Sequence, residues 1–355
     1  MPVVAIAGGT STGLGRALTV AILESADRHW TPVILSRSDK RPPWLRAIDA
    51  DGLVPVVAVD YMSVASISDA LRTHKVHTLL SVALAKDGSQ NRLQLNLVEG
   101  AREAGVQRYV PSYWGLGVEA YRHVTVMRMG AEGVWEACEK AQRETGMQCA
   151  RFNCGGFMNY FGIGAHPPAR QQQQLTDEEL VEQLRQGGGY AAGEDAGEQG
   201  VDRDGDMADG SGCYLLKPRG LCAEVPLSPS GGYPRFTTTT LRDVGRFVAA
   251  ALELETWEGD MNIVGDTVRL DEMIRTTEAL LGKKLAVETI SPADLDKQIG
   301  QLRMPDDFMK LLWLELKREH AKDEVGNGVL DGNVNRMCPH VKPVSFKEYM
   351  HAQWS

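Results

Sequence analysis

The chain has 355 residues, of which 43% are hydrophobic and 24% charged, a composition typical of a globular protein with a substantial core. Its net charge of −9 argues against a dedicated nucleic-acid-binding protein, and no apolar run reaches the roughly 20 residues that a membrane-spanning helix needs. The six cysteines lack C-x-x-C spacing and the first residues lack the basic start of a signal peptide, so we expect reduced thiols in a cytoplasmic protein. The sequence contains no metal-binding motif, and we expect no metal site.

The first 160 residues alternate short apolar strands with amphipathic helices. Each expected strand is a nearly continuous apolar run, which is typical of a parallel sheet covered by helices on both faces. We expect strands at 2–7, 33–36, 54–59, 76–82, 108–111 and 148–153, and helices at 14–25, 43–50, 64–73, 93–104 and 131–145. This order predicts an α/β fold with a doubly wound parallel sheet of the Rossmann type over residues 1–160.

A glycine-rich loop with the sequence GGTSTGLG, at residues 8–15, joins the first expected strand to the first helix. Its spacing allows a tight turn, a close approach of backbone to a pyrophosphate, and close packing of the helix on the strand. The start of the helix then directs free N–H groups at the anion. The loop residues that we expect to hold a dinucleotide are Gly9, Thr10, Ser11, Thr12, Gly13, Leu14 and Gly15.

The residues after the second strand favour NADP(H) over NAD(H). NAD-binding proteins usually have an acid at this place, whereas this chain has Arg37 and Lys40, which suit a 2′-phosphate. Asp60 closes the third strand, where its carboxylate either accepts a hydrogen bond from the adenine amine or caps the next helix. The expected cofactor residues at the ends of later strands are Ala83, Ser112 and Asn153.

The composition changes over residues 166–220, which carry QQQQ, QGGG and a long acidic, glycine-rich run. We expect a mobile surface insertion there, with one short amphipathic helix at 176–186 that Thr176 caps. Order returns from residue 221, and residues 221–355 are expected to form a smaller α/β substrate lobe that also returns elements to the first domain. Its expected strands are 221–228, 234–240, 261–264 and 285–290, and its expected helices are 241–254, 270–281, 292–302 and 306–320.

Several stretches give the chain a family resemblance. They are AGGTSTGLG, SRSDKR, NLVEGAREAGVQRYVPSYWG (96–115), RFNCGGFMNYFG (151–162), TTTTLRDVGRFVAAALE (237–253) and NIVGDTVRLDEMI (262–274). With these the chain resembles the NmrA-like, isoflavone-reductase-like branch of the atypical short-chain dehydrogenases, and its fungal members in particular. The resemblance implies a Rossmann domain that binds NADPH and a C-terminal lobe that closes a substrate cleft. Some family members reduce small, often aromatic secondary metabolites, and others are redox-sensing regulators without turnover.

The chain departs from the family in its proton-transfer residues. The family's lysine is expected near residues 127–134, which read MRMGAEGV, and none of the nine tyrosines has a lysine four residues later. Arg128 is the nearest cation there, and a guanidinium stays protonated and cannot act as a neutral base. Tyr113 stands where the family has an acid, so it is our candidate catalytic residue; the alternative is that it only lines the pocket.

The segment NCGGFMNYFG follows the sixth expected strand and is rich in aromatic residues. Large apolar side chains beside the nicotinamide suit a bulky, flat ligand, although core packing would explain them equally well. The expected substrate-pocket residues are Tyr113, Trp114, Phe157, Met158, Tyr160 and Phe161.

Three functions remain open at this point. The first is an NADPH-dependent reductase of a small aromatic or heterocyclic substrate, such as an iminium or enone that accepts hydride without the family's lysine. The second is a redox-neutral cyclase or isomerase that keeps the cofactor bound. The third is a non-catalytic NADP(H) sensor with a protein partner. The expected ligands are NADP(H) and a small-molecule substrate, with neither nucleic acid nor membrane as a partner.

Overall fold

The fold is built on a parallel six-stranded sheet, seen in a computed structural model that describes residues 1–25, 29–85, 87–165, 175–190 and 214–355. The strand order is β3-β2-β1-β4-β5-β6, and every neighbouring pair is parallel. The strands are β1 (Val3–Ala7), β2 (Thr31–Ser36), β3 (Val56–Ala58), β4 (Val76–Ser81), β5 (Arg108–Val110) and β6 (Gln148–Cys149). This order confirms the predicted doubly wound α/β fold of the Rossmann type.

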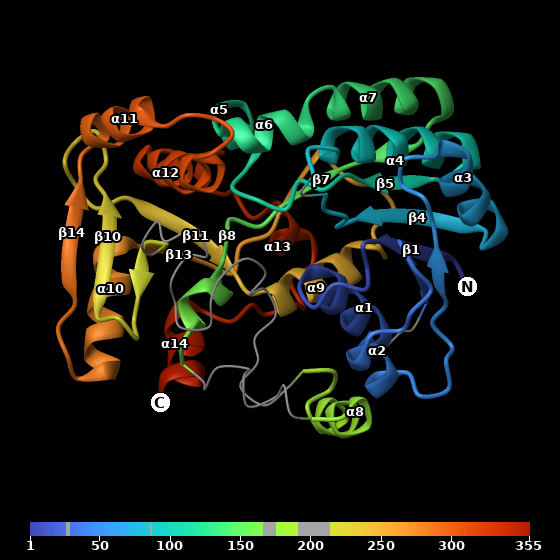
Figure 1. Cartoon of the computed structure of the whole chain (residues 1–355), viewed down its shortest axis with the longest axis horizontal. Coiled ribbons are helices and arrows are strands. Elements are labelled where there is room, and N and C mark those ends of the chain that lie inside the picture. Colours follow the sequence, from blue (N-terminus) through green and yellow to red (C-terminus); the bar gives the residue numbers. More distant parts are fainter. Residues whose placement is uncertain (26–28, 86, 166–174, 191–213) are drawn as a thin grey trace.

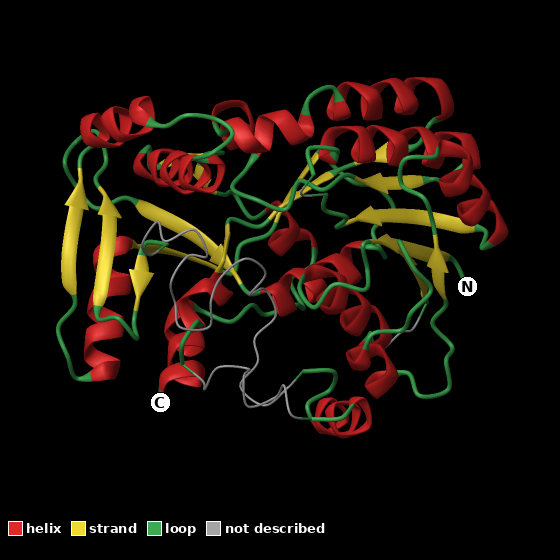
Figure 2. Cartoon of the chain, viewed as in Figure 1, coloured by secondary structure: helices red, strands yellow, loops and turns green. Residues whose placement is uncertain are grey.

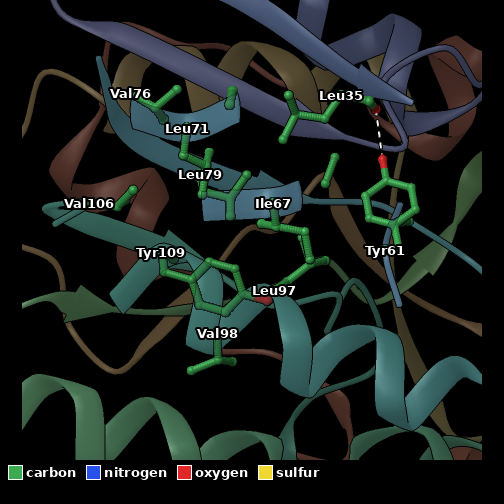
Figure 3. Close-up of a cluster of buried hydrophobic side chains, with 14 of the residues drawn as sticks. Leu35, Tyr61, Ile67, Leu71, Val76, Leu79, Leu97, Val98, Val106 and Tyr109 are labelled. Carbon is green, nitrogen blue, oxygen red and sulfur yellow. Dashed lines mark hydrogen bonds between the residues drawn. The ribbon is translucent and has the colours of Figure 1, made fainter. Parts of the chain in front are cut away.

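Helices cover both faces of this sheet (Figures 1 and 2). One face carries α3 (Val64–Thr73), α4 (Gln90–Ala104) and α7 (Val134–Thr145), and the other carries α1 (Leu14–Glu24) and α9 (Leu241–Ala251). Alternate residues of β1 serve the two faces, because successive side chains of a strand point in opposite directions. Ala5 and Ala7 belong to the core under α3 and α4, part of which Figure 3 shows, whereas Val4 and Ile6 pack against α1 and α9.

The second lobe contains two smaller sheets, ordered β14-β10-β9 and β13-β11-β8. Its strands are β8 (Gly156–Phe157), β9 (Leu216–Lys217), β10 (Cys222–Pro226), β11 (Arg235–Thr239), β13 (Asp266–Arg269) and β14 (Ala286–Ile290). Its helices are η1 (Met158–Gly162), α10 (Leu270–Leu281), α11 (Pro292–Gln301), α12 (Phe308–Ala321), α13 (Asn333–Met337) and α14 (Phe346–Trp354). A short pair, β15 (Glu324–Val325) and β16 (Gly328–Val329), follows α12.

The chain crosses between the lobes several times. After β6 it forms β7 (Arg151–Asn153), which pairs with β12 (Asp260–Asn262) from the far half of the sequence. Figure 1 shows α9 lying beside α1, although the two helices are far apart in the sequence. The fit is close, because a Cβ atom at Gly245 of α9 would lie 2.4 Å from the carbonyl oxygen of Ala17 in α1.

The structure differs from the sequence-based expectation in several places. The strand expected at 148–153 is split into β6 and β7, which belong to different sheets, and β8, β13, α13 and α14 were not expected. The helix expected at 131–145 is preceded by α5 (Val118–His123) and α6 (Thr125–Ala131), and α7 begins only after Gly133, whose φ of +71° breaks the run. Within 166–220, residues 166–174 and 191–213 lie outside the described part. The described remainder packs on the body, since α8 (Asp177–Gln186) lies against α2 (Pro43–Ile48) and β9 joins β10.

In the described ranges, no helix is both long and apolar enough to cross a membrane. Among the same residues, no group of three or more His, Cys, Asp or Glu side chains is arranged to hold a metal ion.

Candidate functional site

A cavity of about 1070 Å³ opens at the carboxyl ends of β1 to β4. Its place is the point at which the strand order turns from β1 to β4, and this is where open α/β sheets bind their ligands. The lining residues are Gly8, Thr10, Ser11, Ser36, Arg37, Ala58, Val59, Asp60, Tyr61, Met62, Val82, Ala83, Leu84, Ala85, Asp87, Ser89 and Leu93. Of the residues expected to bind the cofactor, Thr10, Ser11, Arg37, Asp60 and Ala83 therefore face this cavity.

Gly8 places the glycine-rich loop against the end of β4. Its φ is +79°, and a Cβ atom here would lie 2.7 Å from the Cα of Ala83, so only glycine fits without a backbone shift. Its amide donates to the carbonyl of Leu35 (3.0 Å) and to the hydroxyl of Tyr61 (2.9 Å). Gly8 therefore sets how the loop leaves the sheet.

Tyr61 is a site residue that the sequence-based reasoning missed. Its hydroxyl donates to the carbonyl of Leu35 (2.8 Å, Figure 3) while accepting from Gly8, so it joins β2, β3 and the glycine-rich loop. Burial raises the pKa of the Tyr61 phenol, which keeps it a donor. The signal available in the sequence was a tyrosine next to Asp60, shortly after the third strand.

The other loop residues shape the start of α1. A Cβ atom at Gly15 would lie 2.6 Å from the carbonyl oxygen of Gly9, and one at Gly9 would lie 2.9 Å from that of Ile6. The amide of Gly15 donates to the Ser11 hydroxyl (3.1 Å). Helix α1 begins at Leu14 after Gly13, with no side-chain cap and no acidic residue in its first turn. A helix start of this kind suits an anion.

Five expected loop residues are not in contact with the cavity itself: Gly9, Thr12, Gly13, Leu14 and Gly15. They are absent from the cavity lining, and Thr12 is exposed.

The polar rim of the cavity carries one arginine and two carboxylates. Arg37 is exposed at the end of β2, next to the hydroxyls of Ser36 and Thr10, which lie 3.1 Å apart. Hydrogen bonds from Ser89 lower the pKa of Asp87, and the nearby Arg37 charge lowers it further. Asp60 is exposed and accepts a hydrogen bond from the Met62 amide (2.9 Å).

The other two basic residues after β2, Lys40 and Arg41, do not line the cavity. Lys40 is exposed but does not line the cavity. Arg41 is bound to the carboxylate of Asp49 (2.6 Å). Ser63, whose hydroxyl accepts from the Ser66 amide, caps α3, so the structure does not give Asp60 the capping role.

Two expected cofactor residues lie away from the cavity lining. Ser112 donates its amide to the side-chain oxygen of Gln94 (3.1 Å) and is half-buried. Asn153 is buried, and its amide group donates to Asn262 (2.9 Å) in β12. Gln94 also donates to the carbonyl of Ala83 (3.2 Å), so it connects β5 to the cavity wall and is a second residue that sequence reasoning missed.

Tyr113 and Trp114 are core residues in this structure. The Tyr113 hydroxyl donates to the carbonyl of Ala131 at the end of α6 (3.2 Å), and its ring lies 4.4 Å from that of Tyr121. The indole N–H of Trp114 donates to the carbonyl of Ser81 (2.7 Å). Burial raises the pKa of Tyr113. Both polar groups are therefore used to hold the fold, and neither residue lines the cavity.

The aromatic segment after β7 is partly accessible. Met158 and Phe161 are fully buried, whereas Phe157 and Tyr160 are only half-buried. Phe157 packs against the same core as Leu14 of α1 and Val82 of the cavity wall. Neither Phe157 nor Tyr160 is among the residues that line the cavity.

Tyr160 differs from the other tyrosines of this region in its hydroxyl group. Its ring lies 5.3 Å from Tyr214 and 5.8 Å from Trp313 in edge-on contacts. In the described part of the chain its hydroxyl makes no hydrogen bond. Burial raises the pKa of Tyr160 to about 12, so the phenol stays protonated at neutral pH.

The helix at the expected lysine position is anchored from the second lobe. Residues 125–131 form α6, which contains no lysine, and Arg128 is exposed on it. The buried carboxylate of Glu315 in α12 accepts from the amide (2.6 Å) and the hydroxyl (2.9 Å) of Thr125. Residues 125–131 are therefore an ordered helix without a lysine, held in place by α12.

Comparisons with known proteins were made for the whole chain, and no family model matches it. The chain is 29% identical to Oxidoreductase BOA1 of Botryotinia fuckeliana (strain B05.10) over 282 residues, which are 79% of this chain and 76% of that protein. Its structure resembles that of AtPrR2 with NADP⁺ and (+)-pinoresinol, with a TM-score of 0.66 and 16% identity over 99% of this chain and 98% of that one. It also resembles isoflavone reductase, with a TM-score of 0.62 and 18% identity over 99% and 98% of the two chains. The fold is thus shared with isoflavone-reductase-like proteins.

Proposed function

We propose that the chain is an NADP(H)-dependent oxidoreductase that acts on a small molecule. The observation that carries this proposal is the cavity at the strand-order reversal, which combines a glycine-rich loop at a helix start with Arg37 on the rim. The likeness to an oxidoreductase from a fungus, and to a fold solved with NADP⁺, supports the same activity.

The residues present fit a dinucleotide phosphate. The uncapped start of α1 and the hydroxyls of Thr10 and Ser11 would hold the pyrophosphate, since they offer donors to an anion. Arg37 would bind the 2′-phosphate, because a guanidinium can give two parallel hydrogen bonds to a phosphate group. Bound NADPH would supply the hydride.

We propose that a flat aromatic or heterocyclic substrate binds between the cavity and the half-buried side chains of Phe157 and Tyr160. Phe157 would provide an apolar wall there, and Tyr160 would provide one hydroxyl donor. An iminium needs only the hydride, so it would be reduced without any proton-donating side chain. A carbonyl or enone gains a hydride on carbon and a proton on oxygen, and Tyr160, rather than Tyr113, has a hydroxyl left to give that proton.

A calorimetric titration of the protein with NADPH and with NADP⁺ tests this function and needs no substrate. We expect both to bind, with NADPH tighter, as suits a reductase that waits for its substrate in the reduced form. The proposal would be overturned if neither NADPH nor NADP⁺ bound. Turnover would then be sought with cyclic iminium salts and aryl enones as probes, followed by NADPH absorbance.

A second candidate function is a non-catalytic NADP(H) sensor, and one observation favours it. Helix α6 contains no lysine, and the Tyr113 hydroxyl is already bound to the carbonyl of Ala131. Equal affinity for NADPH and NADP⁺, together with no turnover of either class of probe, would support the sensor. A redox-neutral cyclase or isomerase would instead convert its substrate with the NADPH absorbance unchanged.

A further inference from the structure

Residues 175–190, called the strap from here on, form a folded segment behind the glycine-rich loop. The strap starts with a capping box between Thr176 and Glu179 and continues as α8. Val181 and Leu184 of α8 are buried in one cluster with Trp44 of α2. In Figure 1 α8 lies beside α2, on the side of the molecule that carries α1. The strap is therefore packed on the dinucleotide domain through an apolar contact.

The last residue of the strap, Tyr190, is held by two arginines. Its ring centre lies 4.1 Å from the guanidinium carbon of Arg16 and 3.8 Å from that of Arg242, and both distances are in the range of cation–π attraction. Tyr190 is only 3% exposed. Arg16 also donates to the carbonyl of Gly189 (3.0 Å). The end of the strap is thus fastened to α1 and α9 at once.

Both attachment points lead directly to the glycine-rich loop. Arg16 stands in the first turn of α1, and its backbone amide donates to the carbonyl of Ser11 (3.0 Å). Trp44 donates its indole N–H to the carbonyl of Thr10 (3.3 Å). Thr10 and Ser11 line the cavity. Two separate contact routes therefore join the strap to the loop, one through Trp44 to Thr10 and the other through Arg16 to Ser11.

We propose that docking of the strap and binding of the dinucleotide are thermodynamically coupled. The docked strap holds Arg16 and Trp44 in place, and these residues hold the loop in the conformation that presents Thr10 and Ser11 to the cavity. Coupling of binding equilibria is reciprocal, so a dinucleotide that needs this loop conformation stabilises the docked strap by the same factor. This inference rests on the proposed function, because it takes NADPH as the ligand of the cavity.

Hydrogen exchange of the unmodified protein measures the coupling directly. Exchange is followed by mass spectrometry in peptides covering 177–190, with and without saturating NADPH, because amide exchange reports local opening. We expect NADPH to slow exchange of these amides by about fivefold, the lower end of typical coupling. Slower exchange in the glycine-rich loop with unchanged exchange in the strap would overturn the inference.

Substitutions in the strap test whether loss of docking weakens NADPH binding. Tyr190→Ala removes the ring from both arginines, and we expect it to weaken NADPH binding by about fivefold, matching the exchange factor because the coupling is reciprocal. Leu175→Ala changes an exposed residue of the strap, so this control variant should bind NADPH as the unmodified protein does. Equal affinity of Tyr190→Ala and the unmodified protein would contradict the coupling.

Trp44→Phe separates the two routes. It keeps an aromatic ring against α8 but removes the donor to Thr10, so we expect weaker NADPH binding and a smaller effect of NADPH on strap exchange. If Tyr190→Ala fails to fold, the exchange experiment and Trp44→Phe still test whether strap docking and NADPH binding are coupled. Failure of the unmodified protein to bind NADPH would remove the proposed function and this inference together, whereas normal binding with an unresponsive strap removes only the inference.

Discussion

Polar side chains are exposed on the rim of the dinucleotide cavity, whereas several of those in the aromatic core of the second lobe are hydrogen-bonded to one another or to the backbone. On the rim, Arg37 and Asp60 are exposed and face an open cavity. In the lobe, the hydroxyl of Tyr214 is 2.6 Å from the Nε2 atom of His320, and Trp354 donates to the carbonyl of Phe161 (2.9 Å). Polar groups that face a cavity can meet a ligand, whereas those that are paired internally hold the lobe together. Substitutions on the rim should therefore change binding, and substitutions in the lobe should change stability.

The largest effect is expected at Gly8, where the rim meets the sheet. Gly8→Ala should abolish measurable NADPH binding, because a Cβ atom would lie 2.7 Å from the backbone of Ala83. Gly52→Ala is the matched control, since Gly52 also has a positive φ (+72°) but no atom lies within 4 Å of its added Cβ. The control should lose only about 1 to 2 kcal/mol of stability and keep NADPH binding. Calorimetry and thermal unfolding check both variants, and normal binding by Gly8→Ala would contradict the loop geometry.

Arg37→Ala should give the next largest effect. Loss of a hydrogen bond to a charged group amounts to about 1.5 to 3 kcal/mol, so NADPH binding should weaken by about 10- to 100-fold. Binding of NADH should change little, because NADH has no 2′-phosphate. Lys40→Ala tests the other basic residue, and a change below about threefold is expected because Lys40 is exposed outside the cavity lining. Equal losses of NADPH and NADH would remove the assignment of Arg37 to the 2′-phosphate.

The buried His320 should make the stability of the second lobe depend on pH. Burial lowers the pKa of His320 to about 3 from an ordinary value of 6.5, so the unfolded state takes up a proton first as the pH falls. The contribution of His320 to stability is complete above pH 6.5 and is lost as the pH falls from 6.5 toward 3. Between pH 7 and pH 5 the loss should be about 2 kcal/mol.

Urea unfolding at several pH values measures this loss. The variant His320→Gln removes the titration but keeps a side chain that can hydrogen-bond to Tyr214, so its stability should depend less on pH over the same range. An unchanged pH dependence in this variant would show that other groups cause the loss.

The smallest effects come from a matched pair of tyrosines. Tyr113→Phe removes a donor from the carbonyl of Ala131 and should lower the free energy of unfolding by about 1 kcal/mol, with unchanged NADPH affinity. Tyr160→Phe removes a hydroxyl that has no partner within the described residues, so stability should stay the same. With an enone probe that the protein reduces, Tyr160→Phe should slow turnover more than Tyr113→Phe. The opposite order would return the proton-donor role to Tyr113.

The sequence was sufficient to predict the parallel sheet of the first domain and its glycine-rich loop. The strands and the loop at residues 8–15 follow from local patterns, because a buried parallel strand is a continuous apolar run and a phosphate loop needs glycines at set positions. The helix at 176–186 and its Thr176 cap were also readable, since a capping box involves residues only three apart. Each of these signals lies within a few neighbouring residues, so it can be read without knowing the tertiary contacts.

The candidate site was only partly readable from the sequence, because its details depend on contacts between distant residues. Nothing near Tyr61 in the sequence shows that its hydroxyl meets Gly8, 53 residues away. Tyr113 has the position of a catalytic residue, yet α6 packs so that the carbonyl of Ala131 accepts the hydrogen bond of the Tyr113 hydroxyl. The strap has the composition of a loose insertion, and only the arrangement of α1 and α9 brings Arg16 and Arg242 to Tyr190. Local pattern thus determined which elements form, and tertiary packing decided which polar groups remain available to a ligand.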